Sequence, residues 1–112
     1  MNGFIKKHTV IALICSLFLF INVQATAQNK LSPYVGKYKM VVNGYEAHVD
    51  VFIKDNKLRA KQSWDGKTRT FEYVGDNKFI IAMDGWAIQF IRNKANKVIK
   101  MQVLGSEIWT KV

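Results

Sequence analysis

One stretch decides the fold: Tyr38-Lys39-Met40-Val41-Val42-Asn43-Gly44-Tyr45-Glu46-Ala47-His48-Val49-Asp50-Val51-Phe52-Ile53. Asn43-Gly44 suits a type I′ turn, because both central residues of that turn need a positive φ. On each side of it apolar and polar residues alternate, which is the pattern of a strand with one buried face. The stretch therefore predicts an antiparallel hairpin with strands near 36–43 and 45–54.

Similar turn signals recur at intervals of about 8–12 residues, the spacing typical of a sandwich or barrel. They are Asp55-Asn56, Asp65-Gly66, Gly75-Asp76-Asn77, Asp84-Gly85, Asn93-Lys94-Ala95-Asn96 and Gly105-Ser106. Further strands are predicted near 57–63, 67–74, 78–83, 86–92, 97–104 and 107–111. Val, Ile and Thr, which favour strands, supply 19 of residues 28–112, whereas Leu supplies three. The predicted fold is all-β: a small eight-stranded antiparallel up-and-down barrel or half-barrel whose interior is wide enough to be filled by side chains.

The first 27 residues read as a signal peptide. Lys6 and Lys7 precede an apolar run, and Ala25-Thr26-Ala27 places small residues at the −3 and −1 positions of a cleavage site. The run is about 15 residues long, short of the roughly 20 that a membrane-spanning helix needs. We therefore expect cleavage after Ala27, export to the periplasm or the extracellular space, and no transmembrane span in the mature form.

Cleavage would change the composition of the chain. The full sequence has 112 residues and a net charge of +9; residues 28–112 keep 15 basic and 8 acidic residues, a net charge of +7. They contain no Cys, so the core and the strand ladder must hold the fold without disulfides. We expect residues 28–35 to be a lead-in whose Leu31 and Tyr34 pack over one end of a barrel domain, residues 36–112.

The lead-in also carries a family resemblance. Leu31-Ser32-Pro33-Tyr34-Val35-Gly36-Lys37-Tyr38 resembles the entry motif of a bacterial lipocalin-like domain of unknown function, which is often fused behind serine beta-lactamase-like and penicillin-binding-protein-like hydrolases. Asn56-Lys57-Leu58, Phe79, Ile88-Gln89-Phe90 and the Thr110-Lys111-Val112 ending resemble later parts of its pattern. The resemblance implies a lipocalin-like barrel with an accessory or ligand-binding role. The hydrolase's nucleophile and lysine have no matching positions in these residues, so no catalytic residue is carried over.

The residues offer little catalytic chemistry. His48 and Asp50 share a strand face, but a His–Asp pair needs a nucleophile, and Ser32, Ser63 and Ser106 lie in no nucleophile elbow. In residues 28–112, one His, no Cys and scattered carboxylates do not form a zinc or calcium set. No phosphate-binding glycine loop is present. We expect a protein that is not an enzyme and holds neither metal nor cofactor, with His48 and Asp50 on a solvated face.

The two ends of an up-and-down barrel differ in this sequence. Counted along the chain, the first, third, fifth and seventh turns (the odd-numbered turns) gather at one end of such a barrel. Beside them lie Tyr45, Trp64, Met83 and Trp86, with Trp109 further along its strand. We interpret these first four as candidate ligand-binding residues, because aromatic side chains offer a large apolar area with a polar handle. An apolar ligand, a sugar ring or a partner's side chain would suit them. The alternative is that these aromatics close the barrel and complete its core.

The even-numbered turns are flanked instead by cations: Lys54, Lys57, Lys78, Arg92, Lys94 and Lys97. Such an end could attract anionic lipid headgroups, phosphates of the cell envelope or an acidic protein. The alternative is that these charges only protect strand edges and keep the protein soluble. Export and the lack of an RNP-like aromatic motif argue against nucleic acid as a partner.

Two functions fit these features. The first is a secreted, non-enzymatic binding or accessory module that holds a small apolar or amphiphilic ligand at the aromatic end. The second is a protein-interaction or inhibitor domain that acts on a cell-envelope hydrolase.

Overall fold

The structure is a computed structural model that describes residues 30–112. The predicted signal peptide and its cleavage site after Ala27 lie outside the described residues. Leu31–Val112 form one unit of strands after a short 3-10 helix, η1. The elements are η1 Ser32–Tyr34, β1 Gly36–Val42, β2 Tyr45–Lys54, β3 Lys57–Gln62, β4 Thr68–Gly75, β5 Lys78–Ile81, β6 Ala87–Arg92, β7 Val98–Val103 and β8 Glu107–Lys111.

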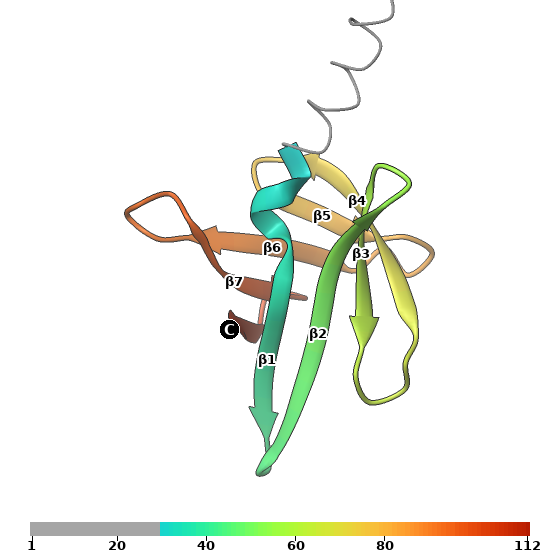
Figure 1. The fold of residues 1–112 in the computed structure, drawn as a ribbon, viewed down its shortest axis with the longest axis vertical. Helices are drawn as coiled ribbons and strands as arrows, with labels where there is room; N and C mark the ends of the chain where they lie inside the picture. The colour runs from blue at the N-terminus through green and yellow to red at the C-terminus, as the bar shows by residue number, and fades with distance from the viewer. Residues whose placement is uncertain (1–29) are drawn as a thin grey trace, which may run out of the picture. The chain divides into compact units, whose positions relative to one another are not determined.

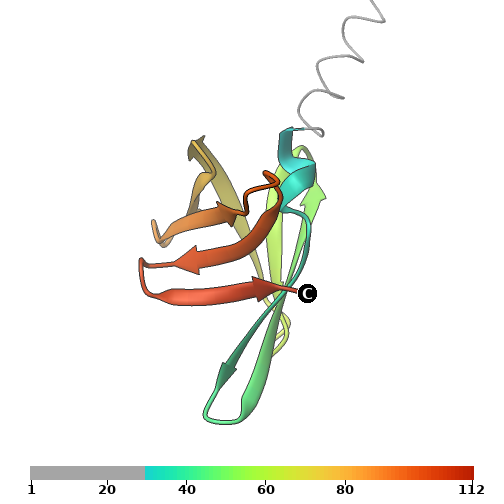
Figure 2. The same cartoon turned by 90° about the vertical axis from the view of Figure 1, so that its left-hand side faces the viewer.

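The eight strands form a closed antiparallel barrel in which each strand pairs with its neighbours in the chain. β8 returns to β1 and closes the barrel through the pairs Tyr38↔Lys111 and Lys39↔Thr110. Figures 1 and 2 show the strands wrapping in order from the first hairpin to the C-terminus. The predicted up-and-down barrel is thus confirmed, and the half-barrel alternative is excluded.

The strands lie within two residues of the predicted bounds. The largest difference is β5, which was expected to reach residue 83 and ends at Ile81. A turn begins there, since the Gly85 N–H donates to the Ile81 carbonyl (2.8 Å). Met83 and Gly85 both take a positive φ, 76° and 71°, and this backbone cannot continue a strand.

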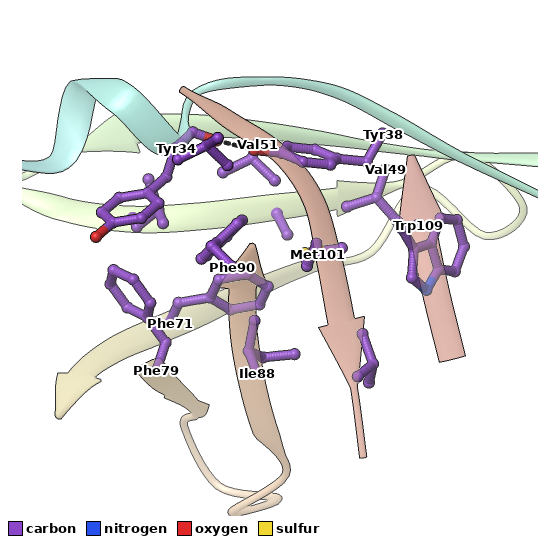
Figure 3. Close-up of a cluster of buried hydrophobic side chains, with 14 of the residues drawn as sticks. Tyr34, Tyr38, Val49, Val51, Phe71, Phe79, Ile88, Phe90, Met101 and Trp109 are labelled. Atoms are coloured by element: carbon purple, nitrogen blue, oxygen red, sulfur yellow. Dashed lines mark hydrogen bonds between the residues drawn. The ribbon is translucent and has the colours of Figure 1, made fainter. Parts of the chain in front are cut away.

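The barrel interior is filled by apolar side chains, as its predicted width implied. The buried cluster contains Leu31, Tyr34, Tyr38, Ala47, Val49, Val51, Leu58, Ala60, Phe71, Phe79, Ile81, Ile88, Phe90, Val98, Met101, Val103 and Trp109. Figure 3 shows aromatic rings from the lead-in, β4, β5 and β6 meeting in this core. Phe79 and Phe90 pack edge to face with ring centroids 5.5 Å apart, a favoured aromatic geometry.

The lead-in closes one end of the barrel. Leu31 and Tyr34 are both buried members of the core cluster, which confirms the prediction made for them. The Tyr34 hydroxyl donates to Asn77 Oδ1 (2.9 Å) in the turn between β4 and β5, and its carbonyl accepts from the Tyr38 hydroxyl (2.7 Å). These contacts fix η1 across the barrel end.

The β1–β2 hairpin reaches beyond the rest of the barrel (Figures 1 and 2). β1 runs to Val42, but its pairing with β8 ends at Lys39, so residues 40–42 have β2 as their only strand partner among the described residues. Val42, expected to share a face with Tyr38 and Met40, is therefore exposed, as are Val41 and Tyr45. We call residues 40–47 the protruding hairpin.

Candidate functional site

Three tryptophans, all that the chain contains, surround a small cavity in the end of the barrel opposite η1. Trp64, Trp86 and Trp109 line it together with core residues such as Val49, Phe71 and Met101. The cavity volume is about 90 Å³. We call this feature the aromatic mouth. Its floor is the hydrophobic core, so anything that enters it meets an apolar surface.

Trp64 lies in the turn between β3 and β4, and Asp65 shapes that turn. Asp65 Oδ1 accepts hydrogen bonds from the Lys67 N–H (2.9 Å) and from the Gln62 side-chain amide (3.1 Å). The Lys67 backbone amide, and after it Gln62, hold the pKa of Asp65 below its usual value. This bonding positions the indole of Trp64 at the mouth with 47% of its surface exposed.

Trp109 is the inner wall of the mouth. It is 4% exposed, and its ring stacks on Trp64 with centroids 5.9 Å apart. Its Nε1–H donates to Glu107 Oε1 (3.2 Å). Figure 3 shows Trp109 among the buried hydrophobic side chains of the core. The stacked pair bridges β8 and the β3–β4 turn.

Polar groups stand at the rim of the same cavity. Gln62, Arg69 and Glu107 all line it. Arg69 Nη1 forms an ion pair with Asp84 (3.2 Å), and Arg69 Nε donates to Gln62 Oε1 (3.4 Å). The rim can therefore donate and accept hydrogen bonds while the floor stays apolar.

The structure brings together two of the four predicted ligand-binding residues. Trp64 and Trp86 share the aromatic mouth. Tyr45 lies on the protruding hairpin, and Met83 extends fully into solvent from the β5–β6 turn; neither lines the cavity. Part of the aromatic set does complete the core, since Trp109 is buried.

Of the six cationic residues predicted at the opposite end, Arg92 and Lys97 line one hollow and the other four do not. Lys54 pairs with Lys57 across the β2–β3 turn, and both are exposed, as are Lys78 and Lys94. Arg92 is half-buried: its Nε donates to Asn77 Oδ1 (2.8 Å), its Nη1 to the Asn96 carbonyl (2.9 Å), and its guanidinium lies 5.5 Å from the Tyr34 ring centroid. Arg92 thus holds the lead-in to the barrel.

His48, predicted to share a strand face with Asp50, contacts Ser63 through its backbone N–H, which donates to Ser63 Oγ (2.9 Å). His48 Nε2 lies 3.4 Å from Glu46 Oε1, and this carboxylate also pairs with Lys39. Within residues 30–112 no group of three or more His, Cys, Asp or Glu side chains is placed to hold a metal ion.

Comparison with protein-family models and with curated proteins finds no match for this chain. In the part of the chain that the structure describes, no helix has the length and apolar character to cross a membrane.

Sequence reasoning missed the polar rim. Gln62, Arg69 and Glu107 stand at strand ends beside odd-numbered turns, the same position that singled out Trp64. Their position beside these turns could have identified them, but charged and amide side chains are also typical of any exposed surface.

Proposed function

We propose that this protein is an exported, non-enzymatic, lipocalin-like binding module that holds one end of a small amphiphilic ligand in its aromatic mouth. The observation that carries the proposal is the cavity among Trp64, Trp86 and Trp109, with its apolar floor and polar rim. Trp64 and Trp86 remain about half exposed although the barrel beneath them is already filled. Large aromatic surfaces left open above a packed core are typical of binding sites.

The size of the cavity determines how a ligand would sit. Its volume of about 90 Å³ is that of about three water molecules, well below the roughly 300–1,000 Å³ of pockets that enclose a whole ligand. A short apolar end, such as a terminal alkyl segment or one ring, fits inside. The polar remainder would lie against the rim, where Gln62, Arg69 and Glu107 offer hydrogen bonds.

Intrinsic fluorescence gives a direct test, because every tryptophan of the chain lines the mouth. Protein expressed from the full-length chain is titrated with octanoate and with octyl glucoside, two probes with the same chain and different headgroups. We expect a saturable change in emission with at least one of them. The absence of a saturable change with both would contradict the proposal.

Calorimetric titration of variants shows where the ligand binds, because calorimetry does not depend on tryptophan fluorescence. Trp64→Ala removes one wall and should weaken binding by about tenfold or more, since burying an aromatic ring contributes about 1.5–3 kcal/mol. Tyr45→Ala and Met83→Ala are the matched controls, because both residues are exposed on the same end without lining the cavity. An equal loss in these controls would place the binding elsewhere.

The protruding hairpin supports a second candidate function, a docking domain for a cell-envelope protein. Val41 and Tyr45 are each 59% exposed, and the β1 edge at Val41 has no strand partner in β8. An extended segment of a partner could add to this edge as a further strand.

Val41→Pro would remove the edge N–H and should abolish capture of such a partner from envelope extract. Val41→Thr, which keeps the N–H, should capture it normally; equal capture by both variants would contradict edge pairing.

A further inference from the structure

A second hollow lies at the other end of the barrel, beside the lead-in. It has a volume of about 570 Å³, within the range of small-molecule sites. It lies between η1, the turn joining β6 to β7, and the end of β8. We call it the basic groove. Its lining residues are Ser32, Pro33, Arg92, Asn93, Asn96, Lys97, Val98, Ile99, Lys111 and Val112.

The side chains that line the basic groove carry positive charge. Arg92, Lys97 and Lys111 line it, and none of its lining residues is Asp or Glu. The ion pairs among the described residues all lie elsewhere: Lys39–Glu46, His48–Glu46, Arg59–Asp55 and Arg69–Asp84. By contrast, the aromatic mouth neutralises its own cation, because Arg69 pairs with Asp84.

Two of the cations are held in place by neutral groups. Arg92 is half-buried and donates hydrogen bonds to the amide oxygen of Asn77, the Asn96 carbonyl and the Tyr34 hydroxyl. Lys111 Nζ donates to the Pro33 carbonyl (3.3 Å). Lys111 also passes close to the backbone of Gly36: a Cβ there would lie 2.6 Å from Lys111 Cε, so the flexible lysine side chain would have to shift.

The β6–β7 turn contributes two amide side chains to the groove lining, Asn93 and Asn96. Asn93 Oδ1 accepts the N–H groups of Ala95 and Lys97, both at 3.0 Å, which leaves the amide nitrogen of Asn93 as the end that can donate to a ligand. Three cations and the amide side chains of Asn93 and Asn96 therefore line the groove, with no Asp or Glu side chain among them. Pro33, Val98 and Ile99 add an apolar wall.

We propose that the basic groove binds a phosphate-bearing anion. Phosphate offers more acceptor oxygens and more charge than a carboxylate, and Arg and Lys are the side chains that commonly bind it. The apolar wall would contact the organic part of the ligand. That ligand is either a soluble phosphate ester or the headgroup of a phospholipid. This inference concerns the end of the barrel opposite the aromatic mouth and does not rest on ligand binding there.

The test uses protein expressed from the full-length chain. Amide chemical shifts are followed by NMR during titration with inorganic phosphate and with glycerol 3-phosphate up to about 10 mM, at constant ionic strength set by chloride. A second arm measures co-sedimentation with phosphatidylglycerol vesicles and with phosphatidylcholine vesicles. Lys97→Gln is the test variant, because Lys97 is an exposed groove residue whose replacement leaves the fold intact. Lys57→Gln is the matched control, with the same change of charge at the same end but outside the groove.

We expect saturable binding in at least one arm, with shifts centred on residues 92–97 and 111. Lys97→Gln should weaken it by about three- to tenfold, the loss expected for one partly exposed charge-assisted contact. Lys57→Gln should change it by less than about twofold. Binding of the soluble esters identifies a free phosphate ligand, and binding confined to anionic vesicles identifies a headgroup; both support the site. No saturation in either arm, or an equal loss with Lys57→Gln, would overturn it.

Discussion

Tyr38 is the residue that connects the core to the lead-in. Its ring is fully buried, and its hydroxyl donates to the Tyr34 carbonyl at 2.7 Å. Burial, and after it the neighbouring Tyr34, raise the pKa of the Tyr38 phenol well above its usual value. The folded protein therefore keeps this proton at a pH where the unfolded chain has lost it.

The first prediction follows from that difference and concerns the variant Tyr38→Phe. Below about pH 10, the pKa of an unfolded tyrosine, wild type should be more stable than the variant by about 1 kcal/mol, the value of the hydrogen bond. Above about pH 10 the contribution of Tyr38 to the free energy of unfolding falls by about 1.4 kcal/mol per pH unit. The difference in stability between wild type and the variant should therefore disappear. Urea denaturation of both proteins from about pH 8 to about pH 11 checks this, and lysine titration cancels in the comparison. A gap that stays constant would show that the phenol is not held neutral.

At the scale of the element, local turn chemistry was enough to predict the hairpins. Each turn signal in the sequence, from Asn43-Gly44 to Gly105-Ser106, lies between two strands of the barrel. These turns need positive φ, which Asn, Asp and Gly adopt readily, so the residue types reveal the turn. The β5–β6 and β7–β8 turns differ because Met83 and Leu104 also take a positive φ, 76° and 55°. A methionine gives no sign of that conformation, and for this reason β5 was predicted too long.

The candidate site could be predicted only in part, for a geometric reason. Odd-numbered turns gather at one end of any up-and-down barrel, and this alone brought Trp64 and Trp86 together. How far each hairpin extends depends on the register between β1 and β8, which no local signal sets. Because that pairing stops at Lys39, the first hairpin protrudes and carries Tyr45 away from the mouth.

At the scale of the whole molecule, barrel closure rests on the contact most distant in sequence. β1 and β8 pair only at Tyr38↔Lys111 and Lys39↔Thr110, and the Val112 N–H donates to the Lys37 carbonyl (2.8 Å). Hydrogen-bonded and non-bonded residue pairs alternate along an antiparallel ladder. The hydrogen bond at Lys37 therefore makes Tyr38↔Lys111 a non-bonded pair and Lys39↔Thr110 the next hydrogen-bonded pair. Such long-range pairing forms at a high cost in loop entropy, and few bonds maintain it.

The variant Thr110→Pro tests how much the fold depends on this closure. Proline removes the N–H of residue 110 from the ladder and should lower the free energy of unfolding by about 1–3 kcal/mol, the cost of leaving its partner carbonyl unpaired. Opening the barrel would also expose the edges of β1 and β8, which should produce concentration-dependent association. Thr110→Val keeps the N–H and a β-branched side chain, so it should remain near wild type in both respects. Urea denaturation and size-exclusion chromatography measure the two effects. If both variants unfold at the same urea concentration, the core alone holds the barrel together, and the β1–β8 ladder contributes little to its stability.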